Sequence, residues 1–301
     1  MRIAVTGKTG QVATALLERG PRAGVEVIPV GRPELDLARP ESAQAVFAAL
    51  APDLIVSAAA HTAVDRAESE PDLAYAINRD GVRAVAEAAA ALGIPIVHLS
   101  TDYVFDGSKA TAWTEGDRTS PLGVYGASKL AGETAVLSAG ARAVVLRTAW
   151  VYAPFGANFV RTMLRLAETR DRLGVVADQV GAPTSALDIA DGILEVASNL
   201  VAAPDARHLE GVFHMGASGE DTTWADFADA IFDGAAARGA RRPIVERISS
   251  AEYPTAAQRP ARSRLDSSRL AELHRVTLPD WQVSLAATLD RLVGPIPVRT
   301  E

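Results

Sequence analysis

Tyr125 and Lys129, four residues apart, are the pair in this sequence best suited to acid–base chemistry. On a helix, this spacing places both side chains on one face. A phenol ordinarily loses its proton at about pH 10. A neighbouring ammonium favours the phenolate, so we expect Lys129 to lower the pKa of Tyr125. The pair could then pass a proton to or from a substrate oxygen while a hydride moves at the adjacent carbon. The chain has only three lysines (the others are Lys8 and Lys109), so a chance match to this spacing is improbable.

Two further segments follow apolar runs and carry residues suited to a binding site. Thr101 lies in the segment Ser100-Thr101-Asp102. Ligands of open α/β sheets bind at the carboxyl ends of the strands, so Thr101 is placed to donate a hydrogen bond to the oxygen that Tyr125 serves. Ala58–Thr62 follows an earlier run, and its small residues would let a cofactor lie against the backbone. We interpret His61 as a cofactor neighbour and not as a catalyst.

A glycine turn near the N-terminus has the features of a phosphate-binding loop. Gly7 and Gly10 stand between a strand-like run and a helical pattern, and Ala13 follows as a third small residue. Such glycines let the backbone turn tightly and approach a pyrophosphate, whose charge is stabilised by the amides of the next helix. The position at the start of an α/β pattern favours a dinucleotide site over an ordinary strand–helix turn.

The end of the second apolar run indicates which dinucleotide binds. Folds that prefer NAD usually place a carboxylate there for the ribose 2′-hydroxyl. This chain has Arg32, a planar cation able to pair with a 2′-phosphate. The sequence therefore favours NADPH over NADH, the alternative being a solvated surface arginine. Asp36 and Leu37 are expected to flank the adenine ring.

The candidate catalytic and cofactor-binding residues can form one site only if a sheet places them along the same edge. Apolar runs alternate with helical patterns in the first half of the chain, which predicts a doubly wound parallel Rossmann-type α/β sheet covered on both faces. A smaller C-terminal lobe is expected to follow. The expected strands are Ile3–Thr6, Val25–Val30, Leu54–Ser57, Ile94–Ser100 and Ala143–Thr148, and the expected helices are Gln11–Arg19, Glu41–Leu50, Leu73–Leu92 and Ser128–Ser138.

The second half is less regular. Residues 1–150 are expected to form the dinucleotide-binding domain and 151–301 mainly a substrate-binding lobe, with parts of 178–215 returning to the first domain. Ser249–Arg264 is interpreted as an ordered loop. The expected elements are helices at Asn158–Thr169, Leu187–Asn199 and Trp224–Ala237, and strands at Leu173–Ala177 and Gly211–Met215.

Composition excludes several classes of protein. The 301 residues carry a formal charge of −7 with no basic stripe, so nucleic acid is not an expected partner. No apolar stretch approaches the roughly 20 residues that cross a bilayer, and the first residues enter a strand and not a signal peptide. We therefore expect no membrane partner and a cytoplasmic location. The chain has no cysteine, which excludes disulfides and thiol catalysis.

Together these segments resemble the extended short-chain dehydrogenase/reductases and, within that group, the dTDP-4-dehydrorhamnose reductase family. The resemblance extends from Ile3 to about Leu273. It is carried by Gly7–Ala13, Ser57–Asp65, Ser100–Asp106, Tyr125–Lys129 and Arg147–Tyr152, and later by Asp178–Thr184, Arg259-Pro260, Ser263 and Leu265.

The resemblance implies NADPH-dependent reduction of the 4-keto group of dTDP-4-dehydro-β-L-rhamnose. It makes Thr101, Tyr125 and Lys129 the catalytic residues, and adds Asp102 and Trp150 as contacts of the dTDP-sugar. Because the substrate diphosphate needs cations, Arg259 and Arg262 are further candidates. The residues implied to line the dinucleotide are Gly10, Gln11, Val12, Asp36, Leu37, Ala60, His61 and Thr62.

Departures from the family and alternative functions bear on this interpretation. The family often has glycine where Ala13 stands, and some members bind a metal between subunits through carboxylates on the first helix. This chain has Ala13-Thr14-Ala15 there, so we expect no such metal and leave a homodimer open. A dehydratase would follow the threonine with Asp-Glu, where this chain has Asp102-Tyr103. A 4-epimerase, another nucleotide-sugar 4-ketoreductase and a non-catalytic NADP-binding regulatory subunit remain alternatives.

Overall fold

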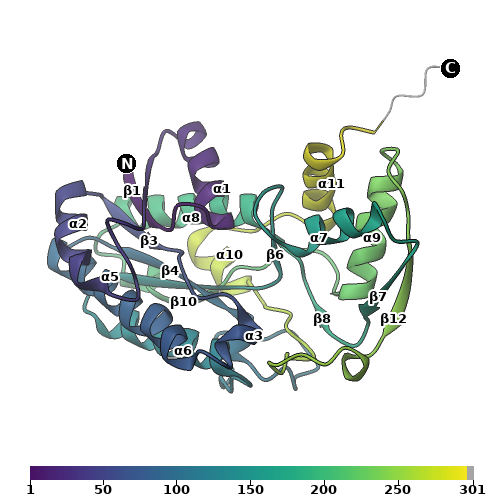
Figure 1. Cartoon of the computed structure of the whole chain (residues 1–301). Coiled ribbons are helices and arrows are strands. Elements are labelled where there is room, and N and C mark those ends of the chain that lie inside the picture. The colour runs from purple at the N-terminus through teal and green to yellow at the C-terminus, as the bar shows by residue number, and fades with distance from the viewer. Residues whose placement is uncertain (297–301) are drawn as a thin grey trace.

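A six-stranded parallel sheet forms the centre of the computed structural model, which describes residues 1–296 (Figure 1). The strand order is β10-β5-β4-β3-β1-β2. The strands are β1 (Arg2–Thr6), β2 (Glu26–Val30), β3 (Leu54–Ser57), β4 (Ile96–Thr101), β5 (Ala143–Thr148) and β10 (Gly211–His214).

The strand order places a crevice next to β1. From β1 the chain adds β2 on one side, whereas β3, β4, β5 and β10 follow on the other. Ile3 of β1 therefore has Val27 of β2 and Leu54 of β3 as neighbours in the ladder. Loops leaving β1 and β3 diverge at such a reversal of strand order, which is where doubly wound sheets bind their ligands.

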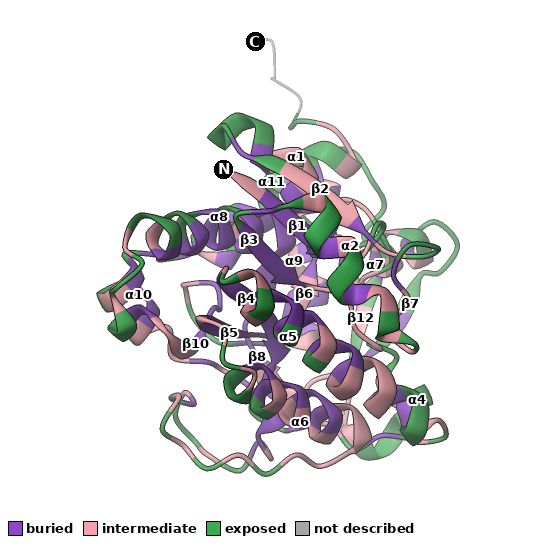
Figure 2. Ribbon diagram, turned by 90° about the vertical axis from the view of Figure 1, so that its left-hand side faces the viewer, coloured by how far each residue is buried: buried purple, intermediate pink, exposed green. Residues whose placement is uncertain are grey.

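Helices cover both faces of the sheet, as the apolar composition of the strands requires. Every residue of β3, β4 and β5 is buried (Figure 2). The helices packed on one face are α1 (Gln11–Arg19), α8 (Ala186–Ala202) and α10 (Ser268–His274). Those on the other face are α2 (Ala43–Leu50), α5 (Val82–Leu92) and α6 (Val124–Ser138).

A second hydrophobic core lies beside the sheet and contains large aromatic side chains. Tyr152, Phe227, Phe232 and Trp281 are all buried in it. Its principal elements are α7 (Phe159–Ala167), α9 (Trp224–Ala236), α11 (Trp281–Leu292) and the parallel pair β7 (Arg172–Val176) and β12 (Ile244–Ile248). The short strands are β6 (Val151–Tyr152), β8 (Val180–Gly181), β9 (Thr184–Ser185) and β11 (Thr222–Thr223), and the short helices are α3 (Val64–Ala67) and α4 (Pro71–Tyr75).

The five strands expected in the first half are confirmed, and two of the expected helices differ. The helix expected over Leu73–Leu92 is divided into α4, a π-helical turn at Ala76–Gly81, and α5. Helix α6 begins at Val124, earlier than the expected Ser128, so Tyr125 lies in its first turn. Gly126 weakens the helical signal there because glycine is a poor helix former.

The expected elements of the second half are present with shifted ends, and besides the two-residue strands β6, β8, β9 and β11 three longer elements were missed. These are β12, α10 and α11. The loop expected at Ser249–Arg264 contains one short 3-10 turn, Ser250–Glu252. No helix within residues 1–296 is both long enough and apolar enough to span a bilayer.

Candidate active site

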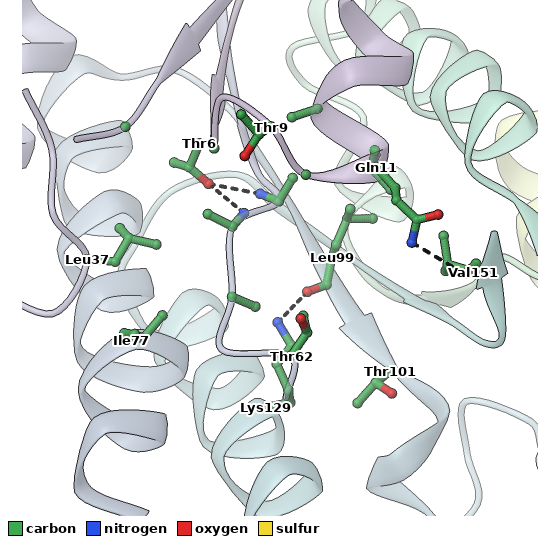
Figure 3. Close-up of a pocket in the computed structure, with 18 of the residues that line it drawn as sticks. Thr6, Thr9, Gln11, Leu37, Thr62, Ile77, Leu99, Thr101, Lys129 and Val151 are labelled. Carbon is green, nitrogen blue, oxygen red and sulfur yellow. Dashed lines mark hydrogen bonds between the residues drawn. The ribbon is translucent and has the colours of Figure 1, made fainter. Parts of the chain in front are cut away.

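A cavity of about 1380 Å³ runs along the carboxyl edge of the sheet (Figure 3). One end is formed by the loop after β1 and by the residues after β2. The other end is formed by the last residues of β4, the first turns of α6 and the segment after β5. One elongated cavity therefore joins the glycine turn to the Tyr125–Lys129 pair.

The glycine turn leaves room for an anion at the start of α1. Gly7 adopts φ +98°, a conformation that favours glycine, and its N–H donates to the Val30 carbonyl at 2.7 Å. A Cβ added at Gly10 would meet nothing within 4 Å. Gly10 caps α1 without a side-chain hydrogen bond, so the first amides of the helix face open space. This arrangement fits the pyrophosphate of a dinucleotide.

Buried polar side chains fix the loop that follows β3. Thr6 Oγ1 accepts from the amides of Ala58 and Ala59, both at 3.0 Å, as the dashed lines in Figure 3 show. Asn78, in the π-helical turn, accepts from the His61 amide at 2.8 Å and donates to the His61 carbonyl at 3.1 Å. Asn78 also donates to Ser128 Oγ of α6 at 3.0 Å. Sequence reasoning missed Asn78, whose only signal is one amide within an alanine-rich helical pattern.

The residues after β2 line the far end of the cavity. Arg32 is exposed there, beside Lys8, which pairs with Glu34 at 2.6 Å. Asp36 accepts from the Ala38 amide at 3.0 Å. Leu37 also lines this end, which suits an adenosine with a cation near its ribose.

Lys129 lies almost wholly buried at the near end of the cavity, with 3% of its surface exposed. Its ammonium donates to the Leu99 carbonyl at 2.6 Å and lies 3.3 Å from Nε2 of His98. Burial lowers the pKa of Lys129 to about 8, while the charge of Glu133 opposes that shift. The ammonium is thus the predominant form at neutral pH.

The pKa of Tyr125 differs from the sequence-based expectation. Burial raises it to about 12, the hydrogen bond with Thr101 acts in the opposite direction, and the charge of Asp102 raises it further. The prediction that Lys129 lowers this pKa is wrong for this arrangement, because the ammonium is directed at Leu99 and His98 and burial dominates. Tyr125 therefore holds its proton at neutral pH, as a proton donor must.

Thr101 and Asp102 complete the polar group around the phenol. Thr101 Oγ1 donates to Oδ1 of Asp102 at 2.9 Å and accepts from the Tyr103 amide at 3.2 Å. Asp102 Oδ2 is buried without a hydrogen-bond partner in residues 1–296. Burial raises the pKa of Asp102 to about 7, against hydrogen bonds from Thr101 and Ser263 that lower it.

Two glycines let α6 pack closely on its neighbours, Gly126 on the turn after β4 and Gly132 on the π-helical turn. A Cβ at Gly126 would lie 2.2 Å from the Tyr103 carbonyl oxygen, and one at Gly132 would lie 2.1 Å from that of Asn78. Both distances are far below contact with backbone atoms that cannot move aside. The glycines of α6 are therefore a geometric requirement for the position of Lys129.

A buried ion pair fastens the same helix to β4 and β5. Glu133 of α6 accepts two hydrogen bonds from Arg147 of β5, at 2.9 and 2.7 Å. Ser100 Oγ donates to the same carboxylate at 2.5 Å. Both charged side chains are at most 5% exposed.

Trp150 forms part of the cavity wall in a strained conformation. Its φ of +49° is unusual for a non-glycine residue. The indole stacks on Trp224 with ring centres 3.6 Å apart and planes 6° apart. Its Nε1 donates to Ser263 Oγ at 3.0 Å. Trp224 belongs to the second core and was missed by sequence reasoning.

Most of the predicted site residues line the cavity, and three do not. His61 turns its ring toward Glu70, with 3.6 Å between Nε2 and the carboxylate, and does not line the cavity. Arg259 pairs with Asp65 at 2.8 Å, and Arg262 is exposed outside the cavity wall. The predicted residues on the wall are Gly7, Gly10, Gln11, Val12, Arg32, Asp36, Leu37, Ala60, Thr62, Thr101, Asp102, Tyr125, Lys129 and Trp150.

Comparison with known proteins identifies close relatives over nearly the full length. Residues 1–293 match the model of the family described as RmlD substrate binding domain. The chain is 52% identical to the dTDP-4-dehydrorhamnose reductase of Sinorhizobium fredii, over 94% of this chain and 95% of that protein. The crystal structure of a dTDP-4-dehydrorhamnose reductase from Clostridium acetobutylicum has a TM-score of 0.88 at 37% identity, covering 97% of this chain and 99% of that one. The enzyme of that name from Bacillus anthracis, in complex with NADP, has a TM-score of 0.87 at 34% identity, covering 95% and 98%.

The ion pair beneath the cavity yields a stability prediction. Arg147→Met leaves Glu133 buried without its cation, which should lower the free energy of unfolding by about 3–5 kcal/mol. The double variant Arg147→Met/Glu133→Leu removes both charges and should recover much of that loss. Urea unfolding followed by circular dichroism measures both. A single variant as stable as the wild type would show that the pair does not stabilise the fold.

Proposed function

Because the chain belongs to the RmlD substrate binding domain family, we propose that it reduces the 4-keto group of dTDP-4-dehydro-β-L-rhamnose with NADPH, giving dTDP-L-rhamnose. The observation that carries the proposal is the cavity that joins the glycine turn at Gly10 to the group of Thr101, Tyr125 and Lys129. The relatives named as reductases of this nucleotide sugar, one of them bound to NADP, support the choice of substrate and cofactor.

The residues fit a bound NADPH, which would supply the hydride. The amides at the start of α1 would hold its pyrophosphate, and Arg32 would pair with its 2′-phosphate. Lys129, which donates to Leu99 and lies near His98, has a third N–H free to reach the nicotinamide ribose. Ala58 and Ala59 leave the cavity floor flat beneath it.

In the proposed reaction, Tyr125 donates its proton to the alkoxide that forms at C4. Thr101 would hold the same oxygen through a hydrogen bond and so fix its distance from the phenol. The phenol is protonated at neutral pH, and an alkoxide is a stronger base than a phenolate, so the proton transfer is still favourable despite the raised pKa. Trp150 would form an apolar wall for the deoxysugar.

The alternatives fit the cavity less well. A dehydratase needs a carboxylate where this chain has Tyr103, whose pKa burial raises further. A 4-epimerase must retain its NAD, whereas the exposed Arg32 favours an exchangeable NADPH. A non-catalytic subunit would not need a buried lysine and a tyrosine together in one cavity. Since NADPH and dTDP-sugars are charged metabolites, we place the proposed reaction in the cytoplasm.

The direct test is to follow NADPH absorbance with the purified chain and dTDP-4-dehydro-β-L-rhamnose, and to identify the product by NMR. The expected product is dTDP-L-rhamnose. No sugar-dependent oxidation of NADPH, or a product with the opposite configuration at C4, would reject the proposal.

Tyr125→Phe tests the proposed acid. The variant should fold and bind NADPH, and its kcat should fall about 100- to 10,000-fold, the usual effect of losing one positioned general acid. Tyr103→Phe is the matched control, because its ring packs edge-to-face on Tyr125 at 5.5 Å. The control should lose far less activity. Wild-type turnover in Tyr125→Phe would remove the phenol from the mechanism.

The reaction should also depend on the charge of Lys129. Its pKa is lowered from 10.5 to about 8, so the ammonium predominates below that pH and is lost as pH rises through it. Tyr125, with a pKa of about 12, stays protonated over the same range. We expect kcat/KM to fall with a midpoint near pH 8. A constant value up to pH 10 would contradict the role of the ammonium.

Arg32→Ala tests the cofactor preference. A charge-assisted hydrogen bond contributes about 1.5–3 kcal/mol, so its loss should raise KM for NADPH about 10- to 100-fold. KM for NADH should remain nearly unchanged, because that cofactor has no 2′-phosphate, and this serves as the internal control. An equal rise in KM for both cofactors would show that Arg32 does not bind the 2′-phosphate.

A further inference from the structure

His98 is a buried histidine to which the proposed reaction assigns no role. It lies on β4 between Ser57 of β3 and Lys129 of α6, and none of its surface is exposed. Its Nδ1 is 3.1 Å from Ser57 Oγ, and its Nε2 is 3.3 Å from the Lys129 ammonium. The imidazole thus bridges two strands and the helix that carries the proposed acid.

The contacts of His98 fix its tautomer. An ammonium can only donate hydrogen bonds, so Nε2 must be the acceptor and the ring proton must be on Nδ1. Nδ1 then donates to Ser57, in agreement with the position of that residue. Burial and the charge of Lys129 both lower the pKa of His98. The ring therefore stays neutral and keeps its acceptor at physiological pH.

Two acceptors share the ammonium of Lys129 within residues 1–296. One is the Leu99 carbonyl and the other is His98 Nε2. A lysine ammonium has three N–H groups, so the two contacts leave one for the cavity.

Several charged or titratable groups surround this ammonium. On its own helix, Glu133 raises the pKa of Lys129, but its carboxylate accepts hydrogen bonds from Arg147 of β5 and from Ser100. Tyr125 and Asp102 face the same cavity. His61, on the loop after β3, turns toward Glu70. His98 is therefore the one side chain among them that accepts a hydrogen bond from the ammonium.

We propose that His98 is a positioning residue: its neutral Nε2 accepts a hydrogen bond from Lys129, stabilises the charged form of that lysine and directs its remaining N–H into the cavity. The reason is that a buried ammonium requires acceptors, and one backbone carbonyl satisfies only one of its donors. The catalytic consequence rests on the function proposed above. The bond between His98 and Lys129 itself does not.

Two amide substitutions distinguish the contribution of Nε2 from that of Nδ1. The Oε1 of glutamine reaches about as far as Nε2, so His98→Gln keeps an acceptor for Lys129. The shorter asparagine places its amide near Nδ1, so His98→Asn keeps a donor for Ser57 and removes the acceptor. A hydrogen bond to the charged form raises the pKa of a lysine. We therefore expect the pKa of Lys129 to fall by about one unit in His98→Asn and to stay near its wild-type value in His98→Gln.

The small number of lysines makes this pKa directly measurable. Carbon-13 label at lysine Cε gives three signals, from Lys8, Lys109 and Lys129. The signal of Lys129 is assigned by its absence in Lys129→Met and is then followed against pH. Lys8 and Lys109, which form surface ion pairs, are the internal controls and should titrate alike in every variant. Equal Lys129 titration in His98→Asn and wild type would overturn the proposal.

A measurement on the wild type keeps the proposal testable if His98→Asn does not fold. Nitrogen-15 shifts of the histidine ring distinguish the two tautomers, and we expect Nδ1 of His98 to carry the proton. A proton on Nε2 would overturn the proposal, because that nitrogen could not then accept from Lys129.

Activity measurements distinguish this inference from the proposed function. The alkaline limb of kcat/KM should shift to lower pH in His98→Asn by the same amount as the Lys129 signal, and return in His98→Gln. Full reductase activity in Lys129→Met would reject the proposed mechanism. It would leave the measured effect of His98 on the titration of Lys129 intact.

Discussion

The site depends on holding one positive charge, that of Lys129, inside a region almost closed to water. A buried ammonium is costly unless its donors find acceptors. The Leu99 carbonyl, at the end of β4, provides the shorter contact, at 2.6 Å, and this requires α6 to lie close above the sheet. Gly126 and Gly132 let this helix pack closely on the turn after β4 and on the π-helical turn, since a side chain at either position would collide with backbone oxygens there. The Glu133–Arg147 pair fastens the helix in place one turn further on. The close packing of α6 and the charged form of Lys129 therefore depend on each other.

Burial also determines what the tyrosine can do. The ammonium of Lys129 is directed at Leu99 and His98, and burial raises the pKa of Tyr125. A neutral phenol is a proton donor, whereas a phenolate would be a proton acceptor. A protonated phenol is what the proposed reduction requires, because in that reaction an alkoxide forms and must be protonated.

Sequence patterns predicted the features of the site that depend on neighbouring residues. The glycine turn, the strand that ends at Ser57 and the Tyr125–Lys129 spacing are local, and each is found in the structure, whereas β4 ends one residue after the expected Ser100. The positioning roles of Asn78 and His98 depend on contacts with residues 17 to 50 and 31 to 41 positions away, which no local pattern records. The ion pair of Arg259 was missed for the same reason. Its partner, Asp65, lies 194 positions earlier in the chain, so the arginine resembled a free cation.

Trp150 shows how the second core takes part in the same site. A positive φ at a bulky residue costs on the order of 1–3 kcal/mol and persists only where surrounding contacts determine it. Here the indole is held by stacking on Trp224 and by its hydrogen bond to Ser263, two residues from different parts of the second half of the chain. Gly181 leaves room for the ring, since a Cβ there would lie 2.7 Å from it. The cavity wall opposite the sheet therefore takes its shape from residues outside the sheet. Rearrangement of the second core would move this wall, whereas the Tyr125–Lys129 pair would stay fixed to the strands.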